Sequence, residues 1–281
     1  MKRILFILIS LYVGILAASA AGIPHLLPWP QKVTWNGKKF QYRGTFVSLT
    51  ENFCSIGMKQ PAGNKIAGNP SNHPALSVKW VEDFPDIPLN RDEAYKLRVT
   101  SKGIEIEAIT ETGVYRAIQT LRQLTEKKGN GIAITGCEIT DWPAFRIRGF
   151  MQDVGRTYIP VDELKREIAI LARYKINVFH WHLTENQAWR LQSKVFPMLN
   201  DSVNTTRQPG KYYTLEEARE LASFCKQHHV LLIPEIDMPG HSAAFVRTFR
   251  HDMQSPEGIK ILKLLIDEVC ETFDVPYLHI G

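Results

Sequence analysis

Ionisable side chains follow four short apolar stretches in the second half of the 281-residue chain. They are Asp153 and Arg156, then His182, Glu185 and Asn186, then Glu235, Asp237 and His241, and finally His279. Each stretch is typical of a buried strand, and the carboxyl ends of parallel barrel strands meet at one rim. A single Asp or His at such a rim is as often a loop ligand for backbone groups as a functional residue. The coincidence across four strand ends predicts one functional site.

The stretch His180-Trp181-His182 places two imidazoles two residues apart. Residues at this spacing project from the same face of a strand, so these histidines could hold one hydrolytic metal ion together with Asp237 and His241. The other interpretation is structural, because a barrel strand turns every second side chain inward along its whole length. From the residues alone both interpretations stay open.

The elements that must position these residues alternate between strand and helix. We predict strands over 148–154, 177–183, 230–237 and 277–281, and helices over 159–175, 214–229 and 255–273. The first helix has Val161, Leu164, Ile168 and Leu171 on one face. The second begins with Thr214 and has Glu217 three residues later, which is the spacing of a capping box. Strands that alternate with helices imply a parallel sheet with crossover helices.

The preceding part of the chain has a different pattern, and the change falls near residues 141–149. Residues 93–110 alternate apolar and polar side chains around a Ser-Lys-Gly turn, which predicts an antiparallel hairpin. A helix is predicted next, from Val114, Ile118, Leu121 and Leu124 at helical spacing, with Gly129 as its stop signal. Residues 52–74 are rich in Gly, Asn and Pro and predict a loop. This part therefore predicts a small α+β domain.

The first residues have the pattern of a signal peptide. Lys2 and Arg3 precede a short apolar run that ends in Ala18-Ser19-Ala20, so residues 1–21 predict a cleaved leader and a secreted or periplasmic protein. A membrane anchor is the alternative, although the run is shorter than the about 20 residues that a span needs. No later stretch is long and apolar enough to span a membrane.

Composition excludes some classes of partner and scaffold. The formal net charge of +5 includes the leader, and no basic stripe follows it, so no nucleic-acid partner is expected. The cysteines lack the density of a disulfide scaffold and have no C-x-x-C spacing, which favours small buried side chains. These cysteines are Cys54, Cys137, Cys225 and Cys270.

Three motifs together resemble the catalytic domain of family 20 glycoside hydrolases, the β-N-acetylhexosaminidases. They are "RGFMQDVGRTYIPVDELKREIAILARYKINVFHWHLTENQAWRLQ", "LIPEIDMPGH" and "YLHIG", in this order over residues 146–281. The resemblance implies an α/β chain with residues 22–143 as the small N-terminal α+β domain of this family. Residues 144–281 are then the first half of a (β/α)8 TIM barrel.

The activity implied by the resemblance is removal of terminal N-acetylglucosamine or N-acetylgalactosamine from glycans, with retention at the anomeric carbon. The nucleophile is the substrate's own 2-acetamido oxygen, and neither a cofactor nor a metal is expected. The partner is a glycan that ends in N-acetylhexosamine. An Asp orients the acetamido group and a Glu acts as general acid and base. In the family this pair follows the motif that here ends at Gly281, so Gly-Asp-Glu is expected next and the 281-residue chain alone is expected to be inactive.

Supporting residues can be carried over from the family motifs one by one. Arg148 matches the arginine that binds the sugar 3- and 4-hydroxyls, for which a planar guanidinium is suited. The pocket floor and the support of the acid pair are expected from Asp153, His182, Asp237 and His241, with His279 beside the pair. Where many members have Asp-Asp, this chain has Glu185 and Asn186. Glu185 keeps a carboxylate, whereas Asn186 removes a charge.

Two further classes of protein remain as alternatives. One is a metal-dependent hydrolase or deacetylase that uses His180, His182, Asp237 and His241. The other is a glycan-binding protein without catalysis.

Overall fold

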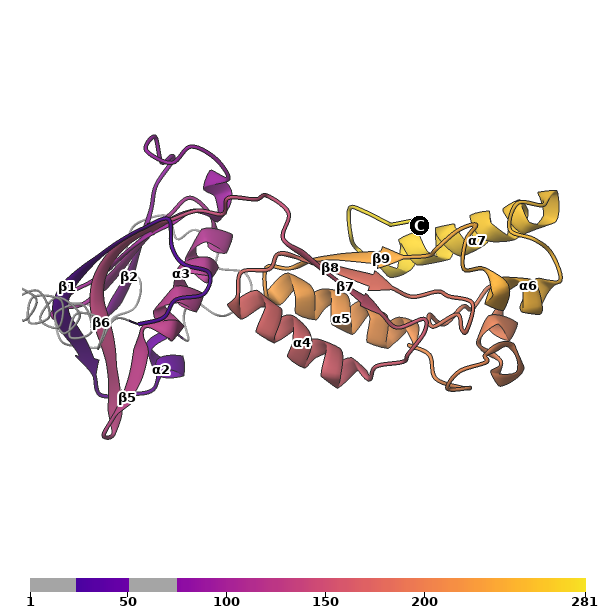
Figure 1. Cartoon of the computed structure of the whole chain (residues 1–281), viewed down its shortest axis with the longest axis horizontal. Coiled ribbons are helices and arrows are strands. Elements are labelled where there is room, and N and C mark those ends of the chain that lie inside the picture. The colour runs from indigo at the N-terminus through magenta and orange to yellow at the C-terminus, as the bar shows by residue number, and fades with distance from the viewer. Residues whose placement is uncertain (1–23, 51–74) are drawn as a thin grey trace, which may run out of the picture. The chain divides into compact units, whose positions relative to one another are not determined.

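The computed structural model describes residues 24–50 and 75–281. Two compact units divide between Trp142 and Pro143. The predicted leader and the predicted loop over residues 52–74 lie outside the described residues. Figure 1 shows both units, which are described separately below.

The first unit is a mixed sheet with one helix packed on it. Its strands have the order β1-β6-β3-β4-β2, with β5 paired to β6. They are β1 (Lys32–Tyr42), β2 (Leu76–Trp80), β3 (Tyr95–Val99), β4 (Ile104–Ala108), β5 (Thr125–Lys128) and β6 (Gly131–Asp141). The pair β3 and β4 is antiparallel, which confirms the predicted hairpin, whereas β2 joins β4 in parallel. The short helices are α2 (Phe46–Thr50) and η2 (Arg91–Glu93).

Helix α3 (Glu111–Gln123) covers this sheet with its predicted apolar face. Val114, Ile118, Leu121 and Leu124 are all buried. The helix begins at Thr110, whose hydroxyl accepts a hydrogen bond from the backbone N–H of Gly113 at 3.2 Å. The expectation for Gly129 was wrong. Residues 125–128 form β5, so Gly129, with φ of 56°, lies in the turn to β6 and does not end the helix. A turn that needs positive φ carries the same glycine signal as a helix end.

The second unit is built on a parallel sheet with the order β7-β8-β9. Its strands are β7 (Gly149–Asp153), β8 (Val178–His182) and β9 (Leu231–Glu235), and its α-helices are α4 (Val161–Arg173), α5 (Leu215–Gln227), α6 (Ala243–Phe249) and α7 (Pro256–Thr272). Two single turns, η3 (Pro197–Asn200) and η4 (Ser202–Asn204), lie between β8 and α5. Figure 1 shows α4 and α5 running side by side along this sheet. The predicted alternation of strand and helix is therefore confirmed.

Local sequence signals account for how the helices of this unit begin and pack. Both hydrogen bonds of the predicted capping box at Thr214 and Glu217 are present. The buried face of α4 contains Val161, Leu164 and Ile168, but its last buried position is Ala172 and not Leu171 as predicted.

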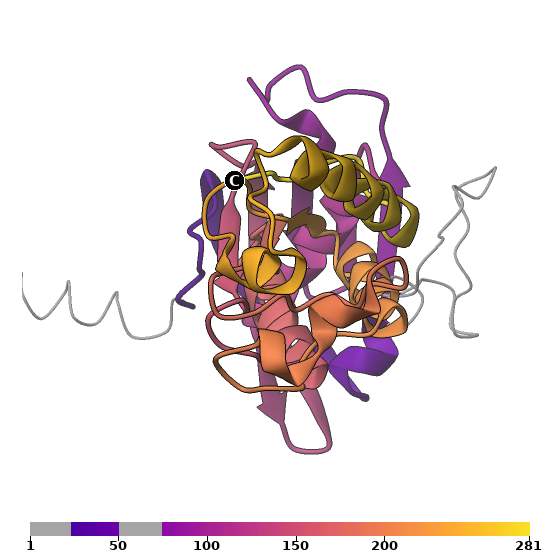
Figure 2. The ribbon, with the colours of Figure 1, turned by 90° about the vertical axis from the view of Figure 1, so that its right-hand side faces the viewer.

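The segment after α7 runs parallel to β9 but pairs with it only through one bridge, between Glu235 and His279. The backbone N–H of His279 donates to the carbonyl of Pro234 at 2.9 Å, and the N–H of Ile236 donates to the carbonyl of His279 at 3.1 Å. The predicted fourth strand is thus an extended segment beside β9. Figure 2 shows the structure turned by 90°, with this segment and α7 at the yellow end of the colour range.

Of the cysteines that the structure describes, Cys137 and Cys225 are buried and Cys270 is exposed. The expectation of buried cysteines was therefore wrong for Cys270, because α7 turns this position to solvent. Among the described residues no helix has both the length and the apolarity to cross a bilayer.

Candidate active site

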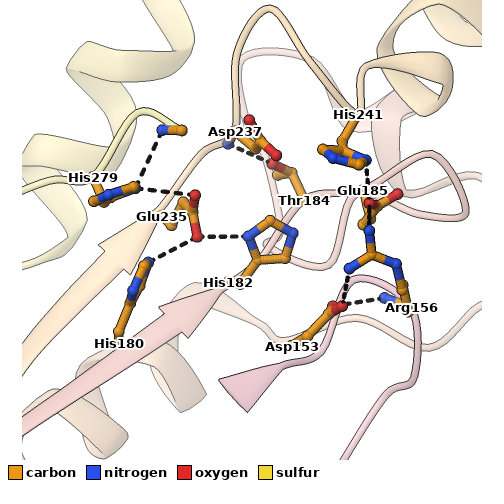
Figure 3. Close-up of polar contacts among 11 residues, drawn as sticks. Asp153, Arg156, His180, His182, Thr184, Glu185, Glu235, Asp237, His241 and His279 are labelled. Carbon is orange, nitrogen blue, oxygen red and sulfur yellow. Dashed lines mark hydrogen bonds and ion pairs between the residues drawn. The ribbon is translucent and has the colours of Figure 1, made fainter. Parts of the chain in front are cut away.

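Four candidate residues form one row across the second unit. In the sheet register Asp153 pairs with His182, His182 pairs with Glu235, and Glu235 bridges to His279. Cross-strand neighbours project from the same face of a sheet. The row stands at the carboxyl ends of β7, β8 and β9, and Figure 3 shows its side chains together with those of the loops that follow.

Glu235 is the hydrogen-bonding centre of this row (Figure 3). Its Oε2 lies 2.7 Å from Nε2 of His180 and 2.5 Å from Nδ1 of His182, and its Oε1 lies 3.0 Å from Nδ1 of His279. The carboxylate is nearly fully buried. Burial alone would raise the pKa of Glu235, but the hydrogen bonds and charges of the three histidines outweigh it and hold the pKa below its ordinary value.

The carboxylate also fixes the proton positions on the rings. An ionised carboxylate only accepts hydrogen bonds, so each neutral ring carries its proton on the nitrogen that faces Glu235. For His182 this nitrogen is Nδ1. Its other nitrogen, Nε2, is buried and has no hydrogen-bond partner within the part of the chain that the structure describes.

A second group of charges forms around Glu185, whose side chain is completely buried. One oxygen of Glu185, Oε1, pairs with the guanidinium of Arg156 and with Nδ1 of His241, and the other accepts from the backbone N–H of Asn186. Arg156 also donates from Nη1 to Oδ2 of Asp153 at 2.5 Å. Its hydrogen bond with Asp153 and the nearby carboxylates raise the pKa of Arg156. Arg156 thus links the end of β7 to the loop after β8.

Gly155 allows this group to form. A Cβ at this position would lie 2.6 Å from Cβ of Glu185. The absence of a side chain lets the turn after β7 pass directly over the Glu185 side chain.

Asp237 lies between the two groups and is also buried. Its backbone N–H donates to the hydroxyl of Thr184 at 2.9 Å. The structure therefore places six of the predicted site residues around one edge of the sheet: Asp153, His182, Glu185, Asp237, His241 and His279.

Arg148 is not among them. It precedes β7 at the end opposite to Asp153, and five residues of extended chain span about 17 Å. Its guanidinium donates to the backbone carbonyl oxygens of Lys175 at 2.7 Å and Phe145 at 2.8 Å. These contacts tie together backbone segments at the start of the strand.

Arg156 and Glu235 also belong to the site, and both were among the residues that follow the predicted strands, although the family motifs did not single them out. The sequence does contain a signal for each. Arg156 stands three residues after Asp153 in the turn that follows the same strand, and Glu235 stands two residues before Asp237 in an extended stretch. Residues at that second spacing share one face.

The metal ligands considered as an alternative from the sequence, His180, His182, Asp237 and His241, are not brought together as one set. Among the described residues, two trios place their ligand atoms within 4.8 Å of one another: His180 with Glu235 and His279, and His182 with Glu235 and Asp237. His241 belongs to neither trio, because its Nδ1 is engaged by Glu185.

Comparisons with known proteins agree on one family. The profile "Glycosyl hydrolase family 20, catalytic domain" matches residues 145–257, and the profile "Glycosyl hydrolase family 20, domain 2" matches residues 24–142. A "Beta-hexosaminidase" from Porphyromonas gingivalis is 35% identical over 229 residues, which are 69% of this chain and 29% of that protein.

Solved structures show the same similarity. The chitobiase of Flavobacterium johnsoniae superposes with a TM-score of 0.75 at 30% identity, over 92% of this chain and 44% of that one. A GH20 exo-β-N-acetylglucosaminidase from Vibrio harveyi, in complex with N-acetylglucosamine, gives a TM-score of 0.75 at 27% identity, over 93% of this chain and 47% of that one. The chain thus spans less than half the length of these three proteins. Because the two profiles together match most of its length, the chain belongs to glycosyl hydrolase family 20.

Proposed function

We propose that the protein removes terminal N-acetylglucosamine or N-acetylgalactosamine from glycans, with the substrate's own acetamido oxygen as nucleophile and with retention at the anomeric carbon. The names of the relatives support this substrate class, and the Vibrio harveyi structure contains N-acetylglucosamine. An internal nucleophile already beside the anomeric carbon gains the large advantage of an intramolecular reaction.

The observation that carries the proposal is the pair of carboxylate–histidine contacts at one edge of the sheet, Glu185 with His241 and Glu235 with His182. Each contact engages Nδ1, so Nε2 of a neutral ring offers a lone pair. The side chain of His241 is 45% exposed. His241 can therefore accept a hydrogen bond from an acid that approaches this edge of the sheet. His182 is buried and supports the floor of the pocket.

For sugar hydroxyls we propose Arg156 in place of Arg148. The Arg156 side chain is 47% exposed and stands at the edge that carries the carboxylates. A guanidinium is a planar fork that can serve two neighbouring hydroxyls. The donors of Arg148 already serve backbone carbonyls at the far end of β7.

The test of this assignment compares two conservative substitutions in the full-length protein. Arg156→Lys keeps the charge but loses the fork, and we expect kcat/KM for an aryl N-acetyl-β-glucosaminide to fall about tenfold or more, since one charge-assisted hydrogen bond contributes about 1.5–3 kcal/mol. Arg148→Lys is the matched control, with little change in kcat/KM expected. A larger fall in kcat/KM for Arg148→Lys than for Arg156→Lys would instead assign the contact with the sugar hydroxyls to Arg148.

The mechanism has a separate test. An aryl β-glucoside, which lacks the acetamido group, should not be turned over, and proton NMR should show the β-anomer as the first product. Equal turnover of the glucoside would exclude assistance by the substrate.

Three further parts of the proposal concern the whole protein. We propose that the second unit is the first half of a (β/α)8 barrel, that the catalytic Asp-Glu pair follows Gly281, and that residues 1–21 direct export. Intact-mass and peptide analysis of the protein from its source tests the last two. Peptides that continue past Gly281 into Gly-Asp-Glu, and a mature N-terminus at Gly22, are the expected results. A mature protein that ends at Gly281 would contradict the proposal that the Asp-Glu pair follows this residue.

A further inference from the structure

His180, Glu235 and His279 form a compact set of ligand atoms, which we call the outer trio. The imidazole centroids of His180 and His279 are 4.6 Å apart. All three ligand atoms lie within 4.8 Å of one another. From this geometry we propose that the outer trio binds one divalent transition metal ion, with zinc as the ion that its chemistry suits best. This inference does not depend on the proposed glycosidase activity.

The spacing is close to that of a bound ion. Zinc lies about 2.1 Å from imidazole nitrogen and carboxylate oxygen, and at tetrahedral angles two such ligand atoms are about 3.4 Å apart. Nε2 of His180 lies 2.7 Å from Oε2 of Glu235, and Nδ1 of His279 lies 3.0 Å from the other oxygen, Oε1. Small side-chain rotations can therefore open the trio to three ligand positions, and water takes the fourth.

The donor set indicates the class of metal. Two imidazoles with one carboxylate suit zinc and copper, whereas magnesium and calcium prefer oxygen ligands throughout. The carboxylate of Glu235 would keep its orientation in the metal-bound state, because its Oε2 also accepts a hydrogen bond from Nδ1 of His182. Hydrogen bonds of this kind orient a ligating carboxylate and strengthen metal binding.

The two histidines can change from hydrogen bonding with Glu235 to metal coordination without an added reactant. In the metal-free protein a neutral His180 donates from Nε2 and a neutral His279 from Nδ1 to the carboxylate. To coordinate through these nitrogens, each ring moves its proton to its other nitrogen and presents a lone pair. Two hydrogen bonds are replaced by two metal–nitrogen bonds, and no net proton is released when both rings begin neutral. Protonated rings would each release one proton.

Access and charge both favour an ion at this place. Within the part of the chain that the structure describes, the side chains of His180 and His279 are 23% and 46% exposed, so an ion can reach the trio there. The alternative trio, in which His182 and Asp237 join Glu235, is buried throughout. The residues labelled in Figure 3 include four carboxylates, one guanidinium and four imidazoles. When the imidazoles are neutral the carboxylates are in excess, and a dication reduces this excess of negative charge.

Isothermal titration calorimetry of the full-length protein with zinc chloride tests the inference. The protein is first treated with a chelator, and Cys270→Ser serves as background because the exposed thiol could itself bind zinc. One saturable site per chain is expected. His180→Asn and His279→Asn should each weaken binding by about tenfold or more, with circular dichroism as the check of folding. Cobalt(II) in place of zinc should give a visible absorption band that reports nitrogen and oxygen ligation, and this band should be lost in the same variants.

Two matched variants locate the ion. His251→Asn removes an exposed histidine outside both trios and should leave the affinity unchanged. His182→Asn keeps a side-chain N–H near the position of Nδ1 and removes no proposed ligand, so it should weaken zinc binding less than His180→Asn or His279→Asn does. Absence of binding to the unsubstituted protein would overturn the inference. So would binding that survives both His180→Asn and His279→Asn, or that is lost only in His182→Asn.

Discussion

Replacing Glu235 by Gln should destabilise the second unit by about 2–4 kcal/mol at pH 7. Three imidazole N–H groups end on this buried carboxylate. The Gln side chain offers one acceptor oxygen, and its NH2 faces ring nitrogens that now carry protons. A lost charge-assisted hydrogen bond costs about 1.5–3 kcal/mol, and a buried donor without acceptor costs about 1–3 kcal/mol. A change of tautomer recovers part of this sum, which leaves about 2–4 kcal/mol.

The difference between the two proteins should also depend on pH. The folded protein holds the pKa of Glu235 below its ordinary value. Its stabilising effect is therefore complete above the unfolded pKa of about 4.3 and is lost as the pH falls through the lower folded pKa. Gln does not titrate. The difference in stability between the two proteins should narrow as the pH falls below about 4.3.

Urea denaturation followed by tryptophan fluorescence measures this gap, since Trp181 is buried in the second unit against Tyr213 and Phe273. Glu163→Gln is the matched control. Glu163 forms an exposed ion pair with Arg166, so its loss should cost less than about 1 kcal/mol. An effect of Glu235→Gln as small as that of the control, or one that does not narrow in acid, would refute the reasoning.

Two other substitutions test the site and the thiols. Gly155→Ala should displace the Glu185 side chain and lower kcat of the full-length protein, because the new Cβ would lie 2.6 Å from Cβ of Glu185; unchanged kinetics would contradict this contact. In the native protein a thiol reagent at pH 8 should label Cys270 but not Cys137 or Cys225, since burial raises the pKa of both buried thiols to about 12. Peptide mapping after labelling distinguishes them, and Cys270→Ser should abolish the native labelling of these three positions.

Predictions from the sequence succeeded where the signal is local. The capping box at Thr214 and Glu217, the apolar face of α3 and the hairpin of β3 and β4 each depend on residues close together in the chain. The strand–helix alternation of the second unit has the same origin, because the periodicity changes within short windows.

The site itself was only partly predictable, because its contacts join distant segments. The sequence shows two arginines near β7 but not which of them reaches the carboxylates of the site. The guanidinium of Arg148 donates to backbone carbonyls, among them that of Lys175, which is 27 residues away. The guanidinium of Arg156 instead pairs with the carboxylate of Glu185. The exposure of Cys270 likewise depends on which side of α7 packs inward. Both outcomes follow from tertiary packing, which residue types and spacing do not specify.

The row of Asp153, His182, Glu235 and His279 has a consequence for how this protein can vary in length. Side chains alternate between the two faces of a sheet. Insertion or deletion of one residue within β8 or β9 would therefore place the side chain of His182 or Glu235 on the opposite face. The crossover connections carry no such constraint, since they only return the chain to the next strand. Relatives should therefore differ freely in the loops around η3 and η4, while the residue count of each strand up to its site residue stays fixed. The hydrogen-bond register of the sheet thus determines which residue of each strand faces the site.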